Sequence, residues 1–240
     1  MYRGITASVA TLAVASAASA TFTGFVVSAS NVTNSGQNLT VYTVVARFNG
    51  PTDTLLNCFN FGAVNGSSLT GFWHKDNAYY NSGVLMQDYG TWNPSQTGSA
   101  TVNRPFDSYL TIGGQATPTN TTNADPSWVS GGNADSRSWN RPDLPTNGTL
   151  GWFNSNPPNL QGRVGQLNNT ATDVRLGQFV LSLGDNAAAA NLRTYTLTLG
   201  YNDGVAGSPV QFATSSFSLP APGACALLGL ASLGSRRRRN

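Results

Sequence analysis

The sequence predicts an all-β protein with one β-sandwich-like domain, and an incomplete β-barrel is the alternative architecture. The 240 residues include no glutamate, only 10% of them are charged, and glycine occurs 26 times. This composition disfavours helices, whose exposed positions prefer Ala, Glu, Lys and Arg, and it favours strands joined by turns. Many short runs of alternating apolar and polar residues, separated by turn-forming sequences, indicate the same class.

The clearest strand candidate is 39–48, where apolar and polar residues alternate. In the next candidate, 54–63, we expect Leu56 and Cys58 to face the core, with Phe61 as a further inward residue. The other expected strands are 22–28, 83–88, 98–103, 106–112, 150–153, 174–183, 192–201 and 210–219. Turn signals separate them: Asn49-Gly50-Pro51, Asn65-Gly66, Asn147-Gly148, Gly184-Asp185-Asn186 and Asn202-Asp203-Gly204.

The segment 113–148 stands out as a long polar loop. It is rich in Gly, Pro, Asn, Thr and Ser, carries no clear strand pattern, and contains Trp128 and Trp139. A structureless connection of this length is uncommon inside a compact domain. Two interpretations stay open: a functional loop docked by its tryptophans, or a disordered insert. The aromatic residues favour docking, since disordered segments are usually poor in them.

The first twenty residues are typical of a secretory signal peptide. Arg3 is the only charged residue, an apolar stretch follows, and the segment ends with the small residues Ala18-Ser19-Ala20. This pattern predicts cleavage after Ala20, so that the mature protein begins at Thr21. The alternative is an Ala-rich helix retained in the fold.

The last residues combine an apolar run with a cluster of positive charge. Pro220-Ala221-Pro222 is followed by the apolar run 223–234 and by four arginines, Arg236, Arg237, Arg238 and Arg239. The prolines end any preceding strand, because proline lacks an N–H and has a fixed φ. Arginines after an apolar segment are typical of a segment held in a membrane with its positive end in the cytoplasm. The alternative is a basic terminus that binds anions nonspecifically.

This order of residues resembles the PEP-CTERM sorting signal of bacterial surface proteins, in a variant with Ala221 at the usual glutamate position. The resemblance implies an exosortase-type sorting peptidase as partner and only transient contact with the membrane. It also implies export to the outer surface or extracellular matrix of a Gram-negative-type bacterium. The expected organisation is a signal peptide at 1–20, a β-sandwich-like domain at 21–219 and a sorting signal at 220–240, with the terminal targeting segments as helices.

A second resemblance concerns the body of the chain. The blocks 106–113, 151–162 and 177–181 are similar to a group of uncharacterised secreted proteins that carry this same C-terminal signal. This resemblance implies a shared scaffold and assigns no activity.

The basic character of the chain belongs to its ends. The formal net charge is +3, but Arg3 and the four terminal arginines lie outside 21–219, which contains 8 basic and 10 acidic residues. The body is therefore slightly acidic, and its single lysine and scattered arginines do not form the basic cluster that a phosphate backbone needs. We expect no nucleic-acid partner.

Few residues are candidates for catalysis or metal binding. His74 is the only histidine, which excludes a cluster of several histidine ligands. Calcium is a possible cofactor, because the long loop supplies oxygen ligands in Asp125, Asn133, Asp135 and Asp143. Cys58 is expected to be a small buried apolar residue, with a reactive thiol as the alternative. We expect no catalytic residues.

Aromatic residues flanked by amides suggest carbohydrate contact. Such rings offer apolar faces to a sugar ring, and the candidate residues are Tyr79, Tyr80, Trp92, Trp128, Trp139 and Trp152. The alternative is that these rings are core or loop anchors. Three functions thus remain open: an exported surface or matrix protein with a structural or adhesive role, a glycan-binding module through Trp128, Trp139 and Trp152, and a hydrolase that uses paired aspartates.

Overall fold

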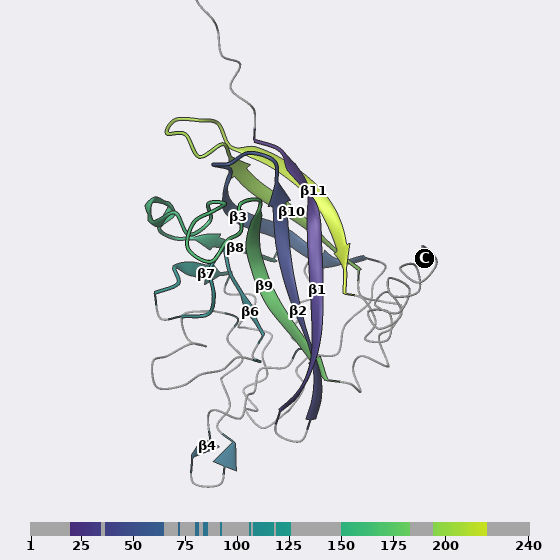
Figure 1. The fold of residues 1–240 in the computed structure, drawn as a ribbon. Coiled ribbons are helices and arrows are strands. Elements are labelled where there is room, and N and C mark those ends of the chain that lie inside the picture. Colours follow the sequence, from purple (N-terminus) through teal and green to yellow (C-terminus); the bar gives the residue numbers. More distant parts are fainter. Residues whose placement is uncertain are drawn as a thin grey trace, which may run out of the picture.

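Two antiparallel sheets pack against each other through their inner faces (Figure 1). The computed structural model describes residues 20–34, 37–64, 72, 80–81, 84–85, 92, 106, 108–117, 119–125, 150–182 and 194–219. The four-stranded sheet has the order β1-β2-β9-β6, with β1 at Phe22–Asn34, β2 at Gln37–Phe48, β9 at Asp173–Ser182 and β6 at Tyr109–Leu110. The five-stranded sheet has the order β11-β10-β3-β8-β7, with β11 at Gln211–Ser218, β10 at Thr194–Asn202, β3 at Thr54–Ala63, β8 at Leu150–Asn154 and β7 at Thr122–Ala124.

The predicted fold class is confirmed. The described strands form a β-sandwich-like pair of layers and not one closed barrel. A small hairpin of β4 (Tyr80–Asn81) and β5 (Val84–Leu85) and a 3-10 helix, η2 (Pro157–Asn159), complete the described elements. Within the described ranges, no helix has the length and apolar character needed to cross a membrane. The expected targeting helices at 1–20 and 220–240 lie outside the described residues, apart from Ala20.

Most expected strands are found. The expected strands 39–48, 54–63, 150–153, 174–183, 192–201 and 210–219 correspond to β2, β3, β8, β9, β10 and β11. β1 continues to Asn34, beyond the expected 22–28, because it pairs with β2 over its whole length. Only Tyr109–Leu110 of the expected 106–112 is a strand, and within 83–88 the structure describes Val84–Leu85 alone as one. The candidate 98–103 lies outside the described residues.

The prediction that 113–148 carries no strand is wrong for β7. Thr122–Ala124 pairs with β8 in antiparallel register. The Thr122 hydroxyl accepts hydrogen bonds from the Ile112 amide at 2.8 Å and from Gln161 Nε2 at 3.0 Å. The strand is too short for a period-two pattern, and distant partners hold it in place, so the local sequence gives no sign of it.

The expectation that Leu56 faces the core is also wrong. Leu55 is fully buried there instead, while Cys58 and Phe61 are buried as expected. The β3–β10 register pairs Tyr201 with Leu55 and Gly200 with Asn57, which leaves Leu56 as the extra residue of a bulge. A second bulge at Asn60, with φ of 54°, turns Phe61 inward. Because of these two bulges, the inward residues of β3 are Leu55, Cys58 and Phe61, which are three positions apart, instead of every second residue.

Aromatic rings fill the centre of the core. Phe61 of β3 stacks on Tyr195 of β10 at 5.0 Å between ring centroids and on Phe179 of β9 at 6.1 Å. Trp152 of β8 meets Phe61 edge-on at 6.0 Å and donates its indole N–H to the Thr111 carbonyl at 3.1 Å. These rings come from both sheets, so they join the two layers.

The sheets approach each other most closely along one side. Figure 1 shows β1 and β11 running side by side at this side of the molecule. Phe25 of β1 and Phe217 of β11 are in edge-to-face contact at 5.3 Å. The outer strands of the two sheets therefore lie next to each other and are joined by side-chain packing.

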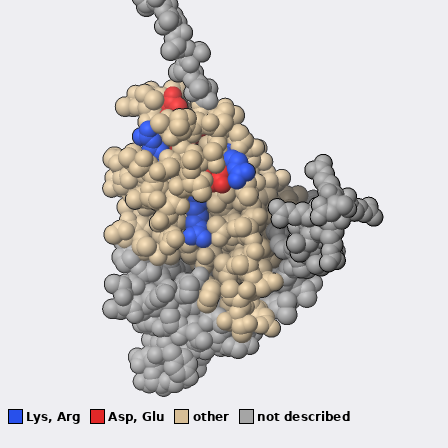
Figure 2. Space-filling model, in the orientation of Figure 1, with Lys and Arg blue, Asp and Glu red and all other residues tan. Residues whose placement is uncertain are grey.

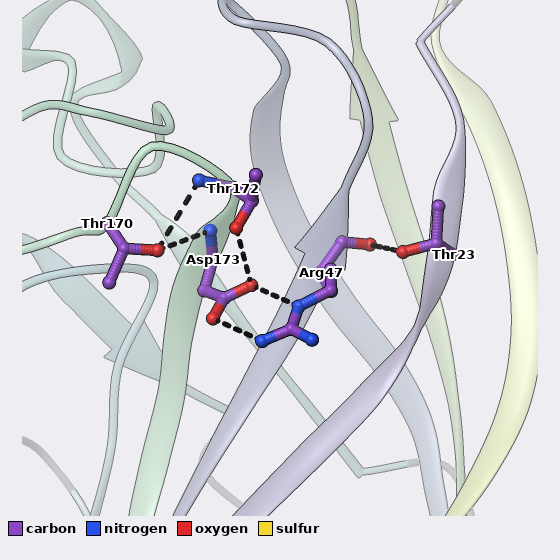
Figure 3. A network of polar contacts seen from close by, with 5 residues as sticks. All are labelled: Thr23, Arg47, Thr170, Thr172 and Asp173. Atoms are coloured by element: carbon purple, nitrogen blue, oxygen red, sulfur yellow. Dashed lines mark hydrogen bonds and ion pairs between the residues drawn. The ribbon is translucent and has the colours of Figure 1, made fainter.

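A polar network ties β1, β2 and β9 together at one end (Figure 3). Arg47 of β2 forms two hydrogen bonds with the Asp173 carboxylate of β9, at 2.7 and 2.9 Å. The Thr172 hydroxyl donates to the same carboxylate, and the Thr23 hydroxyl of β1 donates to the Arg47 carbonyl. The Asp173 amide donates to the Thr170 hydroxyl at 2.9 Å. The network adds side-chain bonds to the backbone pairing of three adjacent strands.

Charge is dilute on the described surface. In the view of Figure 2, blue and red atoms form small separate groups and no continuous patch among the described residues. The Arg47 guanidinium lowers the pKa of Asp173 below its ordinary value, chiefly through the hydrogen bonds between them. The pair is partly exposed, so it contributes less than a buried pair would.

We expect Phe61→Ala to lower the free energy of unfolding by about 3–5 kcal/mol, because it leaves a cavity among rings from both sheets. Urea denaturation would measure the loss. Val205→Ala is the matched control, because Val205 is 59% exposed and should change stability by about 0.5 kcal/mol or less. A loss for Phe61→Ala as small as that of the control would contradict this account of the core.

We expect Asp173→Asn to destabilise the protein at pH 7 and to have little effect in strong acid. A carboxylate with a lowered pKa contributes stability above its unfolded value of about 4, and the contribution disappears as the pH falls through the lower folded value. Denaturation of the wild type and the variant across this range would show their stabilities converging. A difference that stays constant down to acid pH would contradict the assignment.

Candidate functional site

A row of side chains crosses all five strands of the five-stranded sheet. The register places Phe212 of β11 beside Gly200 of β10, and Gly200 beside Asn57 of β3. Asn57 lies beside Phe153 of β8, which in turn lies beside Asn123 of β7. The distance from β11 to β8 is three strand spacings, or roughly 14 Å.

This row lies on the outer face of the sheet. Leu199, Cys58 and Trp152 are sequence neighbours of the row and are buried in the core. Successive side chains of a strand point to opposite faces, so the row points away from the other sheet. Phe212 is 63% exposed and Phe153 is 46% exposed, which leaves both rings open to a partner.

A hollow of about 360 Å³ opens beside the row. Its lining residues come from β3, β8 and the end of β7: Asn57, Cys58, Phe59, Ala124, Asp125, Gly151, Trp152 and Phe153. Gly151 lies between Phe59 and Asp125, whose amide donates to the Gly151 carbonyl at 2.9 Å. A Cβ at position 151 would come within 2.7 Å of the Cys58 carbonyl oxygen, so close strand packing keeps this position free of a side chain.

The Asn57 side chain contributes an unused acceptor. Its Oδ1 atom is buried and has no hydrogen-bond partner among the described residues. This oxygen occupies the space that a Cβ of residue 200 would need, and such a Cβ would also lie 3.2 Å from the Phe212 ring. Gly200 therefore makes room for Asn57. A buried acceptor without a donor costs about 1–3 kcal/mol, and this oxygen is closed to solvent, so it belongs to the packing of the face.

A second hollow, of about 340 Å³, lies at the turn after β8. It is lined by Gly114, Gln115, Thr117, Thr119, Asn120, Asn159, Gln161, Leu167 and Asn168. Its polar groups are neutral, and most of them come from the stretch before β7 and from the turn that follows η2.

The central amides of this second hollow are already satisfied by the protein. Asn120 Nδ2 donates to the Thr111 hydroxyl at 2.8 Å, and its Oδ1 accepts from the Thr122 amide and from Gln161 Nε2. Gln161 Oε1 accepts from the Thr121 amide at 3.0 Å. A network with its partners in place holds structure rigid and leaves little for a ligand to bind. The hollow at Gly151 is therefore the candidate functional site.

The chemistry of the candidate site is neutral and aromatic. Asp125 is the only charged residue among those that line the hollow. Phe59 contacts Phe212 edge to face at 5.8 Å, and together with Phe153 these rings flank Gly151 and Gly200. On β10 and β11 the same face continues with hydroxyl groups, and Thr198 and Thr214 are hydrogen-bonded to each other at 2.8 Å. The site can stack against flat apolar faces and exchange hydrogen bonds at its edges.

Of the aromatic residues that the sequence suggests for glycan contact, the side chains of Trp92 and Trp152 are described and both are buried. Trp152 is only 1% exposed and belongs to the core, so its ring is not available for stacking. Trp92 is fully buried as well, in contact with Phe72 at 5.2 Å. Trp128 and Trp139 lie outside the described residues. The backbone of Trp152 nevertheless borders the hollow, because it lies on β8 between Gly151 and Phe153.

The calcium candidates are only partly described. Asp125 lies at the end of β7 and borders the hollow, while Asn133, Asp135 and Asp143 lie outside the described residues. Among the described residues, no group of three or more His, Cys, Asp or Glu side chains is placed to hold a metal ion. Calcium binding by the long loop remains a prediction.

The paired-aspartate hypothesis gains no support from the described aspartates. Asp53 accepts from the Gly50 amide, Asp173 binds Arg47, and Asp203 accepts from the Val205 amide. Each of these three carboxylates already accepts a hydrogen bond, and no two of them share a partner. Of the remaining residues considered for chemistry, His74 lies outside the described part of the chain, and Cys58 is buried as expected, with the pKa of its thiol raised by desolvation.

The terminal sites are almost entirely outside the described residues. This applies to Ala18 and to the sorting-signal residues Pro220, Ala221, Pro222, Arg236, Arg237, Arg238 and Arg239. Ala20 is described and is buried beside the core.

Comparison with known proteins yields no relative: no family model, no curated protein and no solved structure matches the chain. The site must therefore be interpreted from its own geometry.

The residues that make the outer face do not stand out in the sequence. Phe59, Phe153 and Phe212 each sit in an expected strand, but their side of the sheet depends on bulges and on cross-strand register. One usable sign was present, since Phe153 directly follows the inward Trp152 and therefore has to point outward.

We expect Gly200→Ala to lower the free energy of unfolding by about 1–3 kcal/mol, because the new methyl group overlaps Asn57 Oδ1 and crowds Phe212. In an Asn57→Ala background the same substitution should cost less, since the obstructing oxygen is gone. A double-mutant cycle by urea denaturation measures this coupling. Equal costs in both backgrounds would contradict the described packing.

Proposed function

We propose that the protein is exported and is held briefly in the inner membrane by its C-terminal segment. An exosortase-type peptidase then cleaves it near Pro220–Pro222. The body is displayed on the outer surface or in the extracellular matrix of a Gram-negative-type bacterium, where it has a structural or adhesive role. We propose no enzymatic activity for this role, and calcium, bound by the long loop, is the single cofactor that stays open.

The observation that carries the proposal is the pair of sequence patterns at the two ends of the chain. A charged residue, an apolar stretch and Ala18-Ser19-Ala20 begin it, and Pro-Ala-Pro, an apolar run and four arginines end it. Each pattern is typical of a segment recognised by export or sorting machinery. The apolar run is shorter than the ~20 residues that cross a bilayer comfortably, so the bilayer would have to thin locally around it, at a cost of fractions of a kcal/mol per Å.

The arrangement of the domain supports the proposal. β1 begins at Phe22 and β11 ends at Ser218, so all described strands lie between the two expected cleavage points. Leu219 is only 3% exposed and packs at the end of the core. Cleavage near Pro220–Pro222 would leave every described strand and this contact complete.

The N-terminal side is compatible with cleavage after Ala20. The Thr21 amide donates to Asn49 Oδ1 at 3.1 Å, and the Asn49 amide donates to the Thr21 carbonyl at 3.2 Å. After cleavage, the Thr21 nitrogen becomes a charged amino group and can keep the same acceptor through a stronger hydrogen bond. The domain would lose the buried methyl group of Ala20 and no strand residue.

We expect the protein recovered from its native cell surface to have the intact mass of Thr21 to about Leu219. In a strain that lacks the sorting peptidase, the C-terminal segment should be retained, because the apolar run and arginines are then not removed. Mass spectrometry of both preparations measures this.

Replacement of Arg236–Arg239 by alanine provides a second test in the wild-type strain. Loss of the positive cluster should reduce correct processing and leave the export step intact. The unsubstituted protein gives the decisive result. If it keeps Arg236–Arg239 both in the wild-type strain and in the strain that lacks the peptidase, the sorting proposal is wrong and the basic tail belongs to the mature protein.

A further inference from the structure

We propose that the outer face of the five-stranded sheet binds a neutral polysaccharide, with the chain lying across the strands from Phe212 to Phe153. This inference gives the proposed adhesive role a partner. It rests on that role for its biological setting, whereas binding by the protein does not depend on processing of the tail.

The outer face of the five-stranded sheet is concave beside the row. Gly151 leaves a depression between Phe59 and Asp125, and this depression is the hollow of about 360 Å³. A Cβ at position 151 would lie 2.7 Å from the Cys58 carbonyl oxygen, so a larger residue cannot fill the hollow without moving the backbone. The space above Gly200 is filled by Asn57 Oδ1 and the Phe212 ring, so the depression at Gly151 is built into the sheet beside a closely packed row. Ligand sites are typically concave and preformed in this way.

The chemistry of the face also fits a polysaccharide. A sugar ring has an apolar face of C–H groups and an edge of hydroxyl groups, so it fits a surface where phenyl rings alternate with polar groups. Phe153 and Phe212 provide exposed rings on strands that lie roughly 14 Å apart, a span long enough for an oligosaccharide of a few units. Asp125 lines the hollow beside Phe153, and its carboxylate can accept hydrogen bonds from sugar hydroxyls.

Charge narrows the choice of ligand. The residues of the row and the hollow include no lysine or arginine among the described residues, and Asp125 is their single charge. Phosphate groups and acidic polysaccharides require cationic contacts, so they do not match this face. A neutral polymer with many hydroxyl groups does.

The pattern of apolar groups argues against a second copy of the chain as the occupant. The core of a protein–protein interface is a continuous, closely packed apolar patch. Here Gly200, Asn57 and Gly151 interrupt the rings, and the neighbouring Thr198–Thr214 pair adds hydroxyl groups. The face is thus a set of separate rings with polar groups between them and not a continuous apolar patch.

The experiment measures depletion of the full-length protein from solution by three insoluble neutral polymers, cellulose, chitin and a β-1,3-glucan, with the acidic polymer alginate as comparison. We expect binding to at least one neutral polymer. Phe153→Ala and Phe212→Ala should each weaken this binding by about tenfold, because each removes one stacking ring. Leu167→Ala is the matched control, since Leu167 is 68% exposed at the other hollow and should leave the affinity unchanged.

Four outcomes would overturn the inference: no binding to any of the three neutral polymers, equal affinity in the ring variants and the control, stronger binding to alginate, or self-association that Phe153→Ala abolishes. The last result, read by analytical ultracentrifugation, would assign the face to a second copy of the chain. Circular dichroism of each variant shows that a loss of binding is not a loss of fold. Failure here would leave the mass of the surface protein, and hence the sorting proposal, unaffected.

Discussion

Phe61 of β3 lies between rings from both sheets, stacked on Tyr195 of its own sheet and on Phe179 of the other. Cys58 is a free thiol, and the Arg47–Asp173 pair joins strands of one sheet only, so neither links the layers. Ring packing at the centre and the hydrogen bonds of Trp152 and Thr122 to the segment after β6 thus hold the sheets together. The outer face of the five-stranded sheet depends on where the ring packing places β3.

The two bulges of β3 connect the core to the outer face. The bulge at Asn60 turns Phe61 into the core. The bulge at Leu56 determines that Asn57 and Phe59, which follow it along β3, point outward. Asn57 and Phe59 are therefore presented on the outer face by the same backbone irregularities that pack the centre. Such a surface is rigid, because shifting it would require the core to repack.

The sequence predicts the long central strands well and the irregular parts poorly. β2, β9, β10 and β11 have strong alternation and turns at their ends, so their positions follow from local pattern. Leu56 was misplaced because a bulge has no local signature, and β7 was missed because Thr122 is held by residues far along the chain. For the same reason Trp152 was assigned to a binding surface and its neighbour Phe153 was not. The export and sorting signals depend on local composition alone, and they remain predictions from sequence.

The proposed surface display would bring copies of the protein close together, and the edges of the two sheets have a consequence for such crowding. An open edge strand exposes unpaired N–H and C=O groups, to which a strand of another molecule can add, and this is a common route to aggregation. As described, β6 and β7 have two and three residues, too few for a long intermolecular ladder. The longer edge strands, β1 and β11, lie beside each other with Phe25 against Phe217 (Figure 1). Dense packing of many copies is thus compatible with each copy keeping its own fold.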